Sequence, residues 1–261
     1  MPLKHQQSSR HANTQNHPIP DWALLSTVFI TGACVLIIEL TGTRILAPSF
    51  GSGIYTWSAL ITVTLAALAL GYSFGGRLAD RLPRTDILYN LCLAAGLWTL
   101  TTPILASPLL TAFAGIADFR IALLISCCIL YFPNLFLLGA VVPVVIQCIS
   151  RQRETVGSVS GRVFAVSTAG SLFGALATGF ILIPNFDVQA IFTFCGTLLI
   201  ILALLGNFRP KFIGYTLVLI SIVVSILLLT GNKHDSTSSI EMRANFYGQL
   251  QLISKHGEKS L

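Results

Sequence analysis

The segment Ile54–Arg84 constrains the fold of this chain more than any other. It reads IYTWSALITVTLAALALGYSFGGRLADRLPR, an uncharged and mostly apolar run that ends in charged residues. A helix needs roughly 20 residues to cross a hydrocarbon core of about 30 Å, and only a helix satisfies its own backbone there. We therefore predict that Ile54–Gly75 spans a membrane. Basic residues in short loops resist translocation, so the charged end is expected on the cytoplasmic side.

The rest of the chain is apolar in the same way. Of its 261 residues, 54% are hydrophobic and 10% are charged, whereas a soluble domain carries about 25% charged residues. This composition predicts an all-α, polytopic membrane protein with the lipid bilayer as its surroundings. Seven spans are predicted: Trp22–Pro48, Ile54–Gly75, Ile87–Ser107, Ile121–Ile149, Val163–Ile183, Val188–Gly206 and Phe212–Gly231.

Proline residues are expected to end several of these helices. The first should stop at Pro48 and the third before Pro108, because proline lacks an N–H group and clashes with the preceding turn. The fourth span contains Pro133 and Pro143 and is long, so a tilted, kinked or broken helix is predicted. A broken helix could expose its backbone to a ligand, but prolines are also common in ordinary spanning helices.

Charge distribution predicts the orientation. Residues 1–21 are polar and are expected to form a disordered cytoplasmic tail, residues 22–231 the membrane domain, and residues 232–261 an extracytoplasmic tail. The predicted cytoplasmic segments contain ten Lys or Arg and the external loops two, which fits seven spans with the amino terminus inside. Because the basic residues lie in short loops rather than in one patch, no nucleic-acid partner is expected.

No metal or cofactor is expected. All six cysteines lie in apolar segments without metal-ligand spacing, and buried small hydrophobic residues are their usual role. The histidines of the amino-terminal tail, His5, His11 and His17, have no accompanying cysteine or carboxylate cluster.

Glu39, Arg44 and Asn134 are the candidate substrate or coupling residues. Glu39 lies 17 residues after Trp22, about 25 Å along the helix and near the predicted far interface. Intramembrane ionisable groups are functional candidates by default, and a structural salt bridge or cap is the alternative role for Glu39. Arg44 is the nearest partner, although it lies 140° around an ideal helix, so a pair requires the helix to end near Thr43. Asn134 follows Pro133 in the long fourth span.

The loop GGRLADRLPR resembles the cytoplasmic loop between the second and third helices of the major facilitator superfamily. The resemblance implies a role for Gly76, Asp80, Arg81 and Arg84 in controlling opening between helix bundles. Pro83 stands where that family has its second glycine, and the chain has seven predicted spans rather than twelve.

A second resemblance covers nearly the whole chain. The segments ELTGTRILAPSFGSGIYTWSALITVTLAALALGYSFGGRLADR and GSVSGRVFAVSTAGSLFGALATGFILIP resemble the membrane module of bacterial proteins in which a major facilitator is fused to spermidine synthase. The tail FYGQLQLISKHGEKSL resembles the opening β-hairpin of the enzyme domain. Its alternation predicts one strand, which is expected either to pair with something outside this chain or to remain unstructured. The nucleotide-binding and catalytic residues of such an enzyme would lie beyond Leu261, so no catalysis is expected from the chain alone.

Two functions follow from these patterns. The first is a bacterial inner-membrane module that anchors or partners a spermidine-synthase-like domain, supplied as a separate subunit or within an oligomer. The second is a transporter for a small cation such as a polyamine, for which Glu39, the facilitator-like loop and the prolines are the motivation.

Overall fold

The computed structural model describes residues 20–81, 85–113, 118–150, 156–206, 241–245, 248–255 and 258–260. Its long helices are α1 (Asp21–Phe50), α2 (Ile54–Arg81), α3 (Thr85–Phe113), α4 (Phe119–Ser150), α5 (Val156–Ala177) and α7 (Val188–Gly206). A π-helical turn, η1 (Thr178–Leu182), and the short α6 (Ile183–Asn185) continue α5.

Six helices in these ranges are long and apolar enough to cross a membrane, which confirms the predicted fold class. They correspond to the first six predicted spans. The seventh, Phe212–Gly231, and the predicted disordered tail lie outside the described residues, apart from Pro20 and Asp21 at the start of α1.

The predicted helix ends at proline are wrong. Helix α1 continues past Pro48 to Phe50, and α3 continues past Pro108 to Phe113. Helix α4 is unbroken through both of its prolines. Proline removes one backbone donor, but an interrupted helix would expose several more polar groups, and these have no water to bind inside a bilayer. The helices therefore tolerate the prolines.

Helix α2 continues beyond the predicted membrane span Ile54–Gly75, as far as Arg81. The segment Gly76–Arg81, predicted as a loop, forms the last turns of this helix. Gly75 is buried against Ala140 of α4, so the helix is still packed where the apolar run ends. Its charged residues lie at the end of the helix, where they can reach water.

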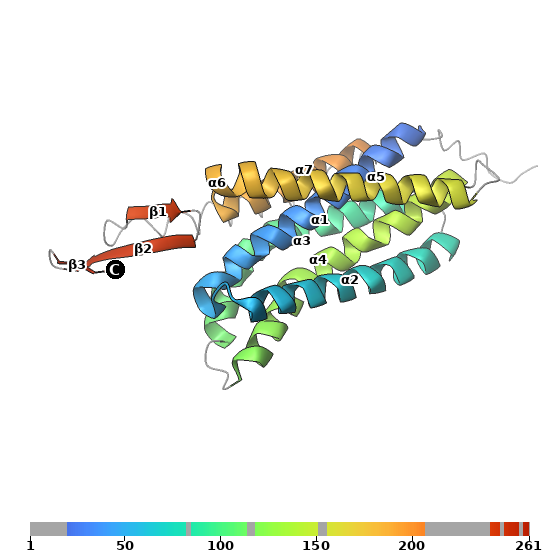
Figure 1. Ribbon diagram of the computed structural model, residues 1–261. Coiled ribbons are helices and arrows are strands. Elements are labelled where there is room, and N and C mark those ends of the chain that lie inside the picture. Colours follow the sequence, from blue (N-terminus) through green and yellow to red (C-terminus); the bar gives the residue numbers. More distant parts are fainter. Residues whose placement is uncertain are drawn as a thin grey trace, which may run out of the picture.

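The helices pack as an open arc in the order α2, α4, α3, α7, α1, α5, with α1 also against α4 at its centre. Figure 1 shows α5 and α2 along opposite edges, with α1 and α4 between them. Extensive packing between α2 and α5 is absent from the described part of the chain. We call the side that α2 and α5 border the open side.

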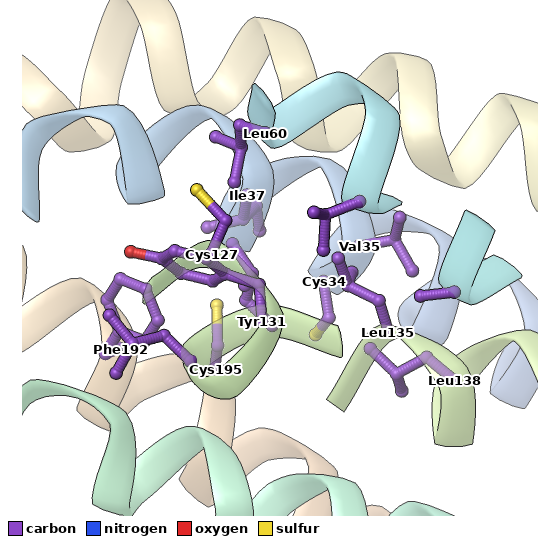
Figure 2. Packing of buried hydrophobic residues seen from close by; sticks show 14 of the residues in the cluster. Cys34, Val35, Ile37, Leu60, Cys127, Tyr131, Leu135, Leu138, Phe192 and Cys195 are labelled. Carbon is purple, nitrogen blue, oxygen red and sulfur yellow. The ribbon is translucent and has the colours of Figure 1, made fainter. Parts of the chain in front are cut away.

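The core lies where α1, α4, α3 and α7 converge. The largest fully buried side chain is Tyr131 of α4, whose hydroxyl donates a hydrogen bond to the carbonyl oxygen of Gly42 in α1 at 3.2 Å. Figure 2 shows Tyr131 with Phe192 of α7 and the thiols of Cys34 and Cys195 in the same cluster. Cys34 of α1 and Cys195 of α7 belong to the same buried cluster, so both contribute to the packing of α1 with α7.

Helix contacts in the first half of the bundle recur in the second half. In α2, a Cβ added at Gly71 or Gly75 would overlap the carbonyl oxygens of Phe136 and Ala140 in α4. In α5, a Cβ added at Gly170 or Gly174 would overlap the carbonyl oxygens of Phe29 and Ala33 in α1 in the same way. Small residues thus let both helix pairs approach to backbone contact.

The aromatic contacts repeat as well. Phe74 of α2 lies 5.3 Å from Phe136 of α4, with rings inclined at 40°. Phe173 of α5 lies 6.0 Å from Phe29 of α1, with rings inclined at 39°. At the centre, Gly96 of α3 and Gly196 of α7 lie against each other.

These recurring contacts make α1, α2 and α3 equivalent to α4, α5 and α7, respectively. The glycine contacts show that α1 runs parallel to α5 and α2 parallel to α4, and α1 is joined to α2 by a short turn that reverses the chain. Helices α1 and α4 therefore run in opposite directions. The bundle is an inverted repeat of two three-helix units, an arrangement found in many transporter folds.

The tail contains strands β1 (Glu241–Asn245), β2 (Gly248–Lys255) and β3 (Glu258–Ser260) in one antiparallel sheet of order β1-β2-β3. Glu241 pairs with Leu252, and Ile253 pairs with Ser260. The predicted strand is confirmed. The expectation that it either pairs outside this chain or remains unstructured is wrong, because segments on both sides of it supply its partners.

Candidate functional site

Glu39 lies on the α1 surface that faces the open side. On an ideal helix it is about 60° from Gly42, which touches Tyr131 of α4, and about 20° from Gly32, which touches Ser167 of α5. Glu39 is partly buried and makes no hydrogen bond or ion pair with any described residue. A carboxylate that pairs with no described residue thus lies between the two repeats.

The predicted partner of Glu39 is not brought to it. Helix α1 continues to Phe50, so Arg44 remains about 140° around the helix and pairs with no described residue. Eleven residues, about 16 Å of helix, separate Glu39 from the end of α1.

Asn134 lies inside the bundle. Its side chain is 1% exposed, and neither Nδ2 nor Oδ1 has a hydrogen-bond partner among the described residues. One turn earlier, Trp98 Nε1 of α3 donates to the carbonyl oxygen of Leu130 at 3.0 Å. Because neither side-chain atom of Asn134 has a described partner, Asn134 is not hydrogen-bonded to Glu39. A buried amide without partners is a candidate for a polar ligand or an ordered water.

We expect Asn134→Leu to stabilise the protein, by about 1 kcal/mol or more, if the amide has only a structural role. The reason is that the substitution removes a buried polar group whose desolvation is not compensated, with little change in volume. Thermal unfolding in detergent measures this, with Asn134→Ala as the control that leaves a cavity. A loss of stability in Asn134→Leu larger than in Asn134→Ala would show that the amide has a partner of its own.

The predicted gating residues lie at the end of α2. Asp80 and Arg81 are exposed and Gly76 is partly buried. Asp80 and Arg81 make no hydrogen bond or ion pair with the described residues. Arg84 lies outside the described residues.

The described residues form no metal site around Glu39, around Asn134 or at the end of α2. Among the described residues, no group of three His, Cys, Asp or Glu side chains is placed to hold a metal ion. Cys34, Cys92, Cys127 and Cys195 are buried, as predicted, and Cys128 is exposed.

Sequence reasoning missed the inverted repeat, although two short patterns indicate it. Phe-x-x-Gly-Ala occurs at Phe29–Ala33 and again at Phe136–Ala140. Gly-x-x-Phe-Gly occurs at Gly71–Gly75 and again at Gly170–Gly174. Residues of both patterns form the close helix contacts described above, so the two patterns indicate the repeat directly.

The fold and site together define an integral-membrane helix bundle built as an inverted repeat. Between the repeats lies the Glu39 carboxylate, which pairs with none of the residues that the structure describes. The chain is similar to "Polyamine aminopropyltransferase 1" of Streptomyces coelicolor, with 26% identity over 164 residues. The match covers 62% of this chain and 29% of that protein. No protein-family model matches, and no solved structure matches.

The length of the match places much of it in the helices. The parts of the chain before Asp21 and after Gly206 together are shorter than half of the 164-residue match. The aligned region must therefore include a large part of the helix bundle. The chain spans less than a third of the relative's length.

Proposed function

We propose that this chain is an integral membrane module that anchors or partners a spermidine-synthase-like domain. The observation that carries the proposal is the similarity to a polyamine aminopropyltransferase that extends into membrane-spanning helices. Most of that relative lies outside the match, so the similarity concerns one part of that protein and not the whole of it. The resemblance to major facilitator proteins fused to spermidine synthase supports the same role.

Co-expression tests the anchoring role. The probe is the part of the Streptomyces relative that lies outside the match, expressed with and without this chain in a bacterial host. We expect it to move to the membrane fraction and to co-purify with the chain only when both are present. A matched control carries a chain lacking residues 246–261, the segment that resembles the opening β-hairpin of the enzyme domain. A stable chain that leaves the probe soluble would contradict the proposal.

A small-cation transporter is the second candidate, and Glu39 favours it. The carboxylate has no described partner, lies between two inverted repeats, and is partly exposed on the open side. Transporter sites commonly lie at the interface of such repeats. Uptake of a labelled polyamine into proteoliposomes containing the purified chain tests this function.

In both cases we propose a bacterial inner-membrane location with the amino terminus in the cytoplasm. The excess of basic residues in the loops after α2 and α4 supports this orientation.

A further inference from the structure

Two serines of α5 lie against α1 on the open side. Ser171 Oγ donates a hydrogen bond to the carbonyl oxygen of Gly32 at 3.1 Å, and a Cβ added at Gly32 would lie 3.3 Å from Ser167 Oγ. Figure 1 shows α1 and α5 side by side along this edge of the bundle. Glu39 lies about 20° from Gly32 around α1 and seven residues farther along it. The carboxylate and the two hydroxyl groups therefore lie along the same boundary between α1 and α5.

Further hydroxyl groups extend this boundary along α5 and into η1. Ser160 and Thr178 each lie about 20° from Ser167 around the helix, so they share its surface. Together the three span about 27 Å of helix, close to the thickness of a hydrocarbon core. The glycine contacts between α1 and α5 advance by four residues on both helices, and continuing them places Glu39 near the level of Thr178. We call these hydroxyls, that of Ser171 and the Glu39 carboxylate the polar boundary.

The equivalent boundary in the other repeat is almost entirely apolar. In the inverted repeat Gly139 of α4 and Leu68 of α2 take the places of Gly32 and Ser167, and their backbones meet in the same way. Leucine suits this close contact as serine does, so packing alone does not require the hydroxyl groups. The residues equivalent to Glu39, Ser160, Ser171 and Thr178 are, in the same order, Ile146, Ile61, Tyr72 and Ala79.

The polar boundary is a poor surface for hydrocarbon. Glu39 and Ser167 are partly exposed, and neither makes a hydrogen bond or ion pair with the described residues. A charged side chain inside the bilayer is costly, so such groups face protein or a water-filled space. A hydroxyl group without a protein partner also loses free energy when it leaves water. Water satisfies both groups, whereas lipid satisfies neither.

We propose that water fills the polar boundary from the end where α5 begins as far as Glu39, while the equivalent boundary between α2 and α4 faces lipid. Ser160, Ser167 and Ser171 lie along this path, and their hydroxyls bind the water. The water solvates the Glu39 carboxylate and gives small cations access to it from that end. This inference goes beyond both proposed functions and depends on neither, because it concerns the access of water and not anchoring or uptake.

Cysteine reactivity tests for this water in the full-length chain. A thiol must ionise to react, and apolar surroundings prevent this, so a charged methanethiosulfonate reagent reports water at the labelled position. In a Cys128→Ser background, Ser167→Cys and Ser171→Cys are compared in proteoliposomes with the equivalent Leu68→Cys and Tyr72→Cys. The α5 positions should react at least about tenfold faster. Tyr72 is 40% exposed and Ser171 is partly buried, so exposure alone predicts the opposite order. Equal rates, or faster reaction at the α2 positions, overturn the proposal.

A second measurement tests whether the water reaches Glu39. A carboxylate raises the local concentration of cations, so it favours a cationic reagent over an anionic one with the same reactive group. At Ser171→Cys, adding Glu39→Gln should lower the ratio of the cationic to the anionic rate by roughly threefold or more. Glu39→Asp keeps the charge and should keep the ratio, and the ratio at Leu68→Cys should not respond to either change. A ratio at Ser171→Cys that is the same with Glu39 and with Glu39→Gln overturns the proposed access to the carboxylate.

Discussion

Replacing Gly170 by valine is expected to disrupt the bundle. A Cβ at this position would overlap the carbonyl oxygen of Phe29 in α1, and a backbone atom cannot move aside by changing rotamer. Helices α1 and α5 must then separate, at a cost of about 3 kcal/mol or more. Reversible unfolding in detergent, or the yield of monodisperse protein where the variant does not refold, measures the effect.

The inverted repeat contains a second glycine in the same kind of contact, and α5 contains an exposed glycine that can serve as a control. Gly71→Val should have an effect of similar size, because Gly71 meets the carbonyl oxygen of Phe136 as Gly170 meets that of Phe29. Gly161→Val is the matched control on the exposed side of α5, where an added Cβ meets nothing within 4 Å. If Gly170→Val were as stable as Gly161→Val at the same protein-to-detergent ratio, the helix packing described above would be wrong.

Removing the charge of Glu39 is expected to abolish cation uptake if the chain is a transporter. Glu39→Gln keeps the size of the side chain but not its charge, and the loss of a partly buried charge that binds a cation costs 2–5 kcal/mol. Uptake of a labelled polyamine into proteoliposomes should therefore fall by at least about tenfold.

Two variants separate this effect from a general loss of structure. Glu39→Asp retains the charge and should retain much of the uptake. Asp187→Asn neutralises an exposed carboxylate between α6 and α7 and should change little. Equal uptake by Glu39→Gln and the unaltered chain would remove Glu39 from the mechanism, while leaving the anchoring role untouched.

The existence and type of the helices could be predicted because twenty apolar residues in succession have few alternatives in a bilayer. Their ends could not be predicted as well. Pro48 and Pro108 indicate helix stops in water, but in lipid the cost of freeing backbone groups is larger than the cost of a proline. Glycine at 76 similarly suggested a loop where α2 continues.

The site was predictable only as a list of residues. Glu39 and Asn134 stand out as polar groups in apolar segments, but the sequence does not show which surface of its helix each occupies. The structure buries Asn134 and leaves Glu39 on the open side. The condition stated for a Glu39–Arg44 pair, an end of the helix near Thr43, is not met because α1 continues to Phe50.

The tail illustrates a different difficulty. The alternation in β2 predicts a strand, whereas EMRAN and EKS are too short and too polar to predict as strands by themselves. They become strands because β2 offers them an antiparallel edge in register.

Labelling of loop cysteines in intact cells tests the inverted repeat most directly. The turn between α1 and α2 and the segment between α4 and α5 are equivalent in the repeat, so they must lie on opposite sides of the membrane. In a Cys128→Ser background, a membrane-impermeant maleimide should label Ser52→Cys in intact cells, and Val156→Cys only after the membrane is opened. Labelling of both positions from the same side would contradict the inverted arrangement of α1–α3 and α4–α7.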